Sequence, residues 1–153
     1  MSRTRATLLL VFMCLMPGWA PSHAATMTVT SLADSGPGTL REAIATASSG
    51  DTIDFGITGT ILLTSGEIAV SSDLAIDGPG APALAIDGNL AGRIFEIASG
   101  ATVVVRDVTI QRGTVPLGGY GGGILNSSEP SRVRWGDCLL WPHSGNRGVA
   151  DLK

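Results

Sequence analysis

The spacing of short stretches that alternate apolar and polar residues narrows the possible folds of this chain more than any other feature. Each stretch has three to five residues and is bounded by Gly, Asp, Ser or Pro, which is typical of short β-strands. The apolar pairs are Ile53/Phe55, Ile61/Leu63, Ile68/Val70, Leu74/Ile76, Leu84/Ile86, Val103/Val105 and Val108/Ile110, with a looser pair at Ile94/Ile97. Strands this short need neighbours in a larger stack.

The stretches recur with a nearly constant period. Pairs of apolar residues separated by 22 or 23 positions are Ile53/Ile76, Ile61/Leu84, Leu63/Ile86 and Ile86/Val108. Three short strands per period of this length predict a solenoid whose turns stack about 4.8 Å apart, with like aliphatic residues forming interior ladders. Leucine-rich repeats share the period, but the leucine framework is absent. The main alternative is an up-and-down barrel or sandwich of short strands.

One short helix is expected before these strands. Thr39 and Glu42 form a capping box, in which the Thr39 hydroxyl accepts the Glu42 N–H and the Glu42 carboxylate reaches the Thr39 N–H. Apolar residues then recur at helical spacing until Gly50, which predicts a helix from Leu40 to Ala47. We also expect a strand from Met27 to Leu32. Residues 25–50 would together close the first end of the solenoid, where Leu40, Ile44 and Ala47 cover the apolar cross-section.

The first 24 residues have the pattern of a secretory signal peptide. Arg3 and Arg5 precede an eleven-residue apolar run, and small residues follow it. A run of eleven is too short to cross a bilayer, which needs about 20 residues, so we expect no transmembrane segment. Cleavage is predicted after Ala24, with cleavage after Ala25 as the alternative, and the mature protein is predicted to be secreted or displayed at the cell surface.

Composition excludes several classes of function. The chain has 10 basic and 13 acidic residues, and its only lysine is Lys153, so it lacks the basic patch that nucleic acids require. No Lys, His, Trp or Cys occurs between Ala25 and Asn126, which excludes histidine bases, cysteine nucleophiles and zinc sites in that stretch. Without its leader the chain keeps one cysteine, Cys138, so the fold must depend on packing alone.

The last part of the chain, residues 127–153, has a different composition. It contains Trp135, Trp141, His143 and Cys138, and it shows little periodicity. We predict an atypical tail, either disordered or produced by a frameshift near Asn126. In the second case the chain is the N-terminal fragment of a longer protein.

Two groups of residues resemble a known class of proteins. The stretches 29–44 and 50–55, with their Leu40-Arg41-Glu42-Ala43 core, resemble the N-terminal capping segment of bacterial right-handed parallel β-helix proteins, which have a pectate-lyase-like fold and are often adhesin-like surface proteins. The segments similar to their coil repeats are 74–78, 84–88, 108–110 and 121–126. The resemblance covers about residues 26–126 and implies an all-β fold, a right-handed parallel β-helix of about three coils (51–126) after a capping α-helix. Thr39 stands where relatives carry a cysteine, and no catalytic residues are transferred.

Stacking brings a few polar residues into consideration. Asp54 and Asp77 would lie on adjacent turns about 5 Å apart, a separation that suits a retaining glycosidase or a calcium site. Asp87 is expected on another side. The simpler interpretation is that Asp77-Gly78 and Asp87-Gly88 are turn dipeptides, where Asp bonds its own backbone and Gly takes a positive φ.

The remaining candidates are weaker. A polysaccharide lyase is suggested by Arg106, Asp107 and Arg112. Neighbours on a strand point to opposite faces, however, so Arg106 and Asp107 are not expected to act at one site, and we expect these charges to be solvated. The Gly118–Gly123 stretch lacks phosphate-loop spacing and predicts a turn. His143 and Cys138 are too few to form a metal site.

We therefore assign no catalytic, cofactor-binding or metal-ligating residue and no cofactor. The predicted function is an exported structural or adhesive module, a non-enzymatic role, with extracellular glycans or proteins as partners. The alternatives are a carbohydrate-active β-helix enzyme of lyase or glycosidase type and a truncated, non-functional remnant.

Overall fold

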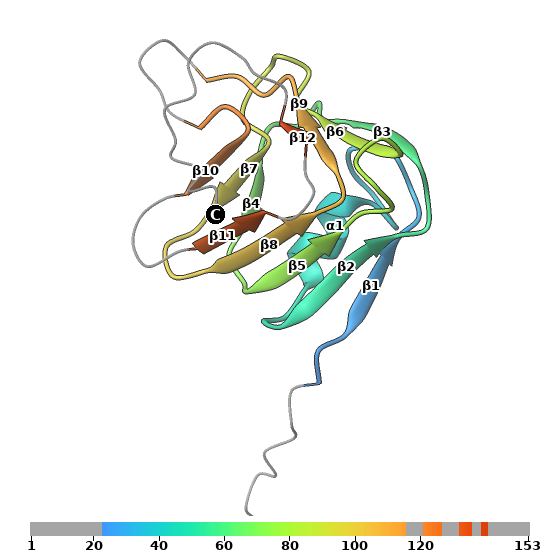
Figure 1. Cartoon of the computed structure of the whole chain (residues 1–153), viewed down its shortest axis with the longest axis vertical. Coiled ribbons are helices and arrows are strands. Elements are labelled where there is room, and N and C mark those ends of the chain that lie inside the picture. The colour runs from blue at the N-terminus through green and yellow to red at the C-terminus, as the bar shows by residue number, and fades with distance from the viewer. Residues whose placement is uncertain (1–22, 116–120, 127–131, 136–138, 141–153) are drawn as a thin grey trace, which may run out of the picture.

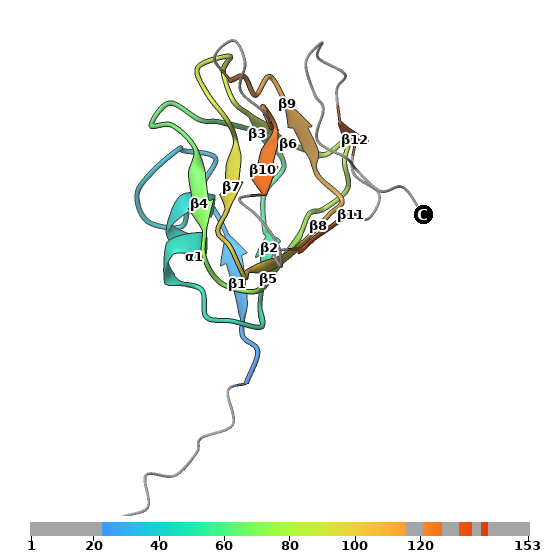
Figure 2. The ribbon, with the colours of Figure 1, turned by 90° about the vertical axis from the view of Figure 1, so that its left-hand side faces the viewer.

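The chain winds through three parallel β-sheets that form the faces of a β-helix (Figures 1 and 2). The computed structural model describes residues 23–115, 121–126, 132–135 and 139–140. Sheet A contains β1 (Thr26–Val29), β2 (Asp51–Phe55), β5 (Leu74–Asp77), β8 (Thr102–Arg106) and β11 (Arg132–Trp135). Sheet B contains β3 (Gly59–Leu62), β6 (Leu84–Asp87), β9 (Thr109–Gln111) and β12 (Leu139–Leu140). Sheet C contains β4 (Ile68–Val70), β7 (Phe95–Ile97) and β10 (Ile124–Asn126).

Every pairing between the described strands is parallel. Successive strands pass from sheet A to sheet B to sheet C and return to sheet A one level further along the stack, with right-handed winding (Figures 1 and 2). Strands β2 to β10 make three full turns, so the predicted parallel β-helix of about three coils between residues 51 and 126 is confirmed. An up-and-down barrel or sandwich would need antiparallel neighbours and is excluded.

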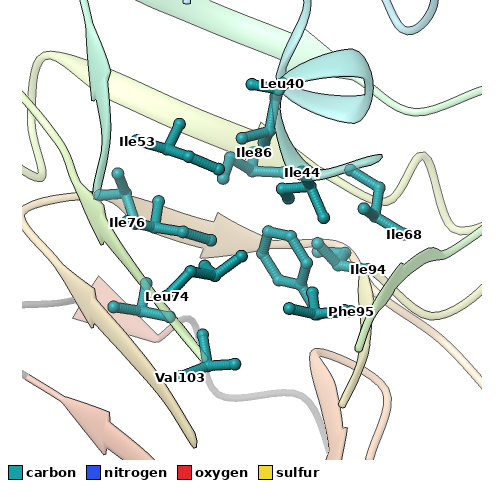
Figure 3. Packing of buried hydrophobic residues seen from close by; sticks show 14 of the residues in the cluster. Leu40, Ile44, Ile53, Ile68, Leu74, Ile76, Ile86, Ile94, Phe95 and Val103 are labelled. Carbon is teal, nitrogen blue, oxygen red and sulfur yellow. The ribbon is translucent and has the colours of Figure 1, made fainter. Parts of the chain in front are cut away.

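The interior consists of aliphatic ladders, as the spacing predicts. Ile53 lies beside Ile76, which in turn lies beside Val105 on the next turn, and none of the three is more than 1% exposed. Figure 3 shows side chains from successive turns meeting in one core, with Phe95 filling its centre. Burying each such side chain contributes about 1.5–3 kcal/mol, and these ladders are what holds the short strands together.

The predicted register is right in sheet A and wrong in sheet B. The pairs predicted wrongly are Ile61/Leu84, Leu63/Ile86 and Ile86/Val108. Ile61 lies beside Ile86, and Ile86 lies beside Ile110. Each predicted partner is therefore two positions away from the observed one. The corner between β2 and β3 is residues 56–58, whereas the next corresponding corner is 78–83. A slip of two residues keeps each side chain on the same face, so the alternation predicts the core but not the length of each corner.

The helix α1 (Leu40–Thr46) lies against β1 and β4 at the N-terminal end of the stack (Figure 2). It starts where predicted, because the Thr39 hydroxyl accepts the Glu42 N–H at 3.3 Å, and it ends one residue before the predicted Ala47. The Glu42 carboxylate reaches the Gly38 N–H at 2.7 Å rather than that of Thr39, since the chain turns at Gly38 with a φ of +74°. Leu40 and Ile44 are buried against the first turn, as expected of a cap.

Both predicted terminal segments lie largely outside the described residues. Of the predicted signal peptide, only His23 and Ala24 are described, and both are exposed. Within the predicted tail, β11 and β12 extend sheets A and B by one parallel strand each. Across the described part of the chain, no helix has the length and apolar character needed to span a bilayer.

Candidate functional site

One row of outward-facing polar residues crosses sheet A and brings together the two carboxylates that the sequence singles out. Asp54 of β2 lies beside Asp77 of β5, as predicted from their spacing. Thr28 lies next to Asp54 on one side, and Arg106 lies next to Asp77 on the other. Successive side chains on a strand point to opposite faces, so the buried Ile53 directs Asp54 to the outer face. We call these four residues the sheet A row.

The two carboxylates of the sheet A row have different surroundings. Arg106 Nε lies 3.8 Å from Asp77 Oδ1, and both side chains are nearly half exposed, so this ion pair is weak. Asp54 Oδ1 is shielded from solvent and accepts no hydrogen bond. A buried oxygen without a donor costs about 1–3 kcal/mol, so this atom is a candidate contact for a bound hydroxyl or cation.

The arginines proposed for lyase chemistry make structural contacts. Arg106 points along the row to Asp77, while Asp107 ends the strand in a left-handed conformation with a φ of 56°. Arg112 donates from Nε to the carboxylate of Asp87 at 2.8 Å.

Asp87 lies on sheet B, away from Asp77 on sheet A, as expected. Its side chain is almost completely buried and accepts hydrogen bonds from the Asn89 N–H, Gln111 Nε2 and Arg112 Nε. Burial alone would raise the pKa of Asp87, but hydrogen bonds from Arg112, the Asn89 N–H and Gln111 outweigh it and lower the pKa. The bond to Asn89, two residues on, is the local turn contact that the sequence predicts.

The reason for glycine at positions 78 and 88 differs from the predicted one. Neither residue adopts a positive φ; in the same corners Gly80 and Asn89 do so, as do Asp107 and Arg112 one turn further along. A Cβ at Gly78 would lie 2.2 Å from the Asp107 carbonyl oxygen, and a Cβ at Gly88 would lie 2.8 Å from that of Arg112. Both glycines are therefore required because the backbone of the next turn passes too close for a side chain.

A second polar cluster, which no motif or spacing in the sequence indicates, surrounds Asp34. One carboxylate oxygen accepts Arg41 Nη2 at 2.8 Å, and the other accepts the N–H groups and hydroxyls of Thr64 and Ser65. Burial would raise the pKa of Asp34, but the bonds from Ser65, Arg41 and Thr64 hold it far below its usual range. Its partners from the stack lie about 30 positions away, so no local pattern identifies them.

Arg41 connects this cluster to the first turn of the stack. Its Nη2 donates to the Gly66 carbonyl and its Nη1 to the Glu67 carbonyl. The Glu67 carboxylate in turn accepts Arg93 Nη1 at 2.8 Å. Both carboxylate oxygens of Asp34 and the donors of Arg41 thus have partners within the protein. The Asp34 cluster therefore attaches the cap to the coils and is not a candidate binding site.

The other candidates fall mostly outside the described residues. Of the Gly118–Gly123 stretch, only 121–123 are described; Gly121 has a φ of 70°, and the Gly123 carbonyl accepts the Ile94 and Phe95 N–H groups, as in a turn between coils. His143 and Cys138 lie outside the described residues. In the part of the chain that the structure describes, no three His, Cys, Asp or Glu side chains gather closely enough to hold a metal ion.

Comparison with known proteins leaves the geometry as the basis for function. No protein-family model, no curated protein and no solved structure matches the chain.

Proposed function

We propose that this protein is an exported β-helix module with a structural or adhesive role at or beyond the cell surface. The observation that carries the proposal is the alternation of buried apolar and outward polar side chains along the strands of sheet A. Inward residues such as Ile53 and Ile76 form the core, while outward residues such as Asp54 and Asp77 lie side by side on the outer face of the parallel sheet. The stack is therefore stable irrespective of what its outer face binds, and that face is suited to extracellular glycans or proteins.

The binding role is tested with the exported protein on arrays of extracellular glycans and matrix proteins. If sheet A is the contact face, replacing Asp54 and Asp77 by Ser weakens binding at least tenfold. The matched control is Ala85→Ser, which changes an outward residue of sheet B. Equal loss in both variants, or an unchanged affinity in the first, contradicts a binding face on sheet A.

Export is the second part of the proposal, and residues 1–24 support it through their charged start, apolar run and small residues. Expression of the full chain in a Gram-negative host, followed by fractionation, N-terminal sequencing and intact mass, tests it. We expect a product outside the cytoplasm that begins at Ala25. Recovery of the uncleaved chain in the cytoplasm contradicts export.

We also propose that the stack belongs to a longer β-helix. A helix covers its N-terminal end, whereas β10, β11 and β12 each pair on one side only among the described strands. Parallel edges of this kind accept a further coil. Sequencing the gene beyond the codon for Lys153 tests this: an open frame encoding more coils, in either frame, is expected, and its absence overturns the proposal.

A carbohydrate-active enzyme is the second candidate, favoured by the partnerless Asp54 Oδ1 beside Asp77 and Arg106. Incubation with polygalacturonate and calcium, with the absorbance of unsaturated product as readout, is the test. Turnover that Asp54→Asn abolishes would establish this candidate over the adhesive one. A non-functional remnant, the third alternative, would lack a cooperative thermal transition, which circular dichroism of the exported protein measures directly.

A further inference from the structure

The backbone of Ala25 makes two hydrogen bonds to the first residues of β2. The Ala25 N–H donates to Asp51 Oδ1 at 2.8 Å, and the Ala25 carbonyl accepts the Thr52 N–H at 2.8 Å. Ala25 immediately precedes β1, and the described residues 23–26 are all exposed. Among the described residues, the residue that follows the predicted cleavage site therefore contacts the start of β2 through both its N–H and its carbonyl.

Cleavage between Ala24 and Ala25 changes the chemistry of this contact. Hydrolysis by a signal peptidase adds one water across the peptide bond, so that Ala24 leaves with a carboxylate and Ala25 keeps an amine, which takes up a proton at neutral pH. The donor facing Asp51 then changes from a neutral amide to an ammonium group. Charge-assisted hydrogen bonds are roughly twice as strong as neutral ones.

We infer that Asp51 is the binding site for the newly formed N-terminal ammonium group of Ala25, so that removal of the leader completes the first corner of the stack. This inference rests on the export that we propose above. Asp51 is suited to the role because its residue is buried and its second oxygen, Oδ2, is held by the Ser48 N–H at 2.8 Å. The carboxylate is therefore also held by a donor other than Ala25.

The geometry also distinguishes the two predicted cleavage positions. Cleavage after Ala24 retains both contacts of Ala25, one to Asp51 and one to Thr52. Cleavage after Ala25 removes this residue, and with it the donor to Asp51 and the acceptor for Thr52. The structure therefore favours the product that begins at Ala25.

Among the described residues, Asp73 is the acidic residue that stands just before the next strand of sheet A. Asp73, which follows the equivalent corner of the next turn, accepts the Thr102 N–H at 2.6 Å and so has its own donor. The nearest histidine in the sequence, His23, departs with the leader. The hydrogen bonds from the Ala25 and Ser48 N–H groups already lower the pKa of Asp51, which keeps it ionised when the ammonium group forms.

The experiment measures the pKa of the Ala25 amino group in the processed protein. Reductive methylation with ¹³C-formaldehyde labels amino groups, and Lys153 is the only lysine, so the spectrum contains two signals. We expect the α-amino signal to titrate at a pKa raised above the usual range of about 7.7–8.0, because the Asp51 carboxylate favours the charged form. In Asp51→Asn it should return to that range, whereas the matched control Asp73→Asn should leave it raised.

The outcomes separate this inference from the proposal of export. A processed protein that begins at Ala25 but whose α-amino pKa is ordinary, or is unaffected by Asp51→Asn, overturns the pairing and leaves export intact. A protein cleaved elsewhere, or not cleaved, overturns the assignment of the processing site. If Asp51→Asn fails to fold, Asp51→Glu replaces it: its longer side chain displaces the carboxylate from Ala25 and should lower the α-amino pKa.

Discussion

Replacing Gly78 by alanine tests the stacking of adjacent turns at a point where the backbone of the next turn passes close by. A Cβ at Gly78 would lie 2.2 Å from the Asp107 carbonyl oxygen and 2.4 Å from Val108 Cγ1. An ordinary contact begins near 3.4 Å, so the facing backbone has to move by about 1 Å. Gly78 does not adopt a positive φ, so the effect of a methyl group here is steric and not conformational.

The expected cost follows from what that movement disturbs. The Gly78 N–H donates to the Arg106 carbonyl and the Gly80 N–H to the Asp107 carbonyl, each at 3.0 Å. Weakening two such bonds at about 0.5–1.5 kcal/mol each, or overpacking the corner, both give a destabilisation of roughly 1–3 kcal/mol. Val108 is fully buried, so the displaced side chain has no free space nearby.

The matched control is Gly92→Ala, because a Cβ at Gly92 meets no atom within 4 Å and its φ is not positive. There the substitution should be neutral or stabilise by about 0.4–1 kcal/mol, since it restricts the unfolded chain. Urea unfolding followed by circular dichroism measures both variants. A Gly78→Ala protein as stable as Gly92→Ala would show that the second and third turns do not pack as described.

Three further predictions concern the cap and the sheet A row. Thr39→Ala, which removes the helix N-cap, should lower the free energy of unfolding by about 1 kcal/mol in a urea titration. The control Thr46→Ala, at the other end of the helix, should lower it by less than about 0.5 kcal/mol. Because the pKa of Asp34 is lower in the folded protein than in the unfolded chain, its contribution to stability is complete above about pH 4 and is lost as the pH falls further. The stability difference between the wild type and Asp34→Asn should therefore shrink from pH 6 to pH 3, and a constant difference would contradict this linkage. Asp54→Thr should leave thermal stability unchanged or raise it, because Asp54 Oδ1 has no donor to lose; a clear fall in Tm would reveal a structural partner for that oxygen.

The sequence predicts those features that depend on side-chain alternation and fails where they depend on the next turn. Ile53 and Ile76 are correctly paired because their spacing and their inward direction are both visible in the chain. Ile61 is assigned to the core but to the wrong partner, since alternation does not reveal how many residues a corner contains. Gly78 is recognised as a turn residue, but its close neighbour Asp107 becomes apparent only when the turns are stacked.

The candidate site divides in the same way. The adjacency of Asp54 and Asp77 follows from a spacing of 23 residues in the sheet whose register is predicted correctly. The Asp34 cluster could not be foreseen, because Asp34 stands in an ordinary Asp-Ser-Gly-Pro-Gly turn and receives Thr64 and Ser65 from a corner about 30 residues away. Pairwise spacing finds residues within one sheet, whereas contacts between the cap and a corner have no period.

That non-periodic contact explains how so short a helix can serve as a cap. Helix α1 has seven residues, and isolated helices shorter than about 12 residues are marginal in water. Leu40 and Ile44 gain stability by packing on the first turn, a contribution that is largely non-directional. Directional bonds from Arg41 to Asp34 and to the Gly66 carbonyl fix its position.

The same bonds make the cap dependent on the coils as much as the coils depend on the cap. The corner that receives Arg41 is the one whose Glu67 binds Arg93 of the second turn, and Arg93 Nε donates to the Gly121 carbonyl of the third. A continuous series of polar contacts therefore runs along one corner of the stack from the helix to the third turn. Because the helix is too short to form first and the first turn would expose its apolar end without it, α1 and the coils have to fold as one cooperative unit.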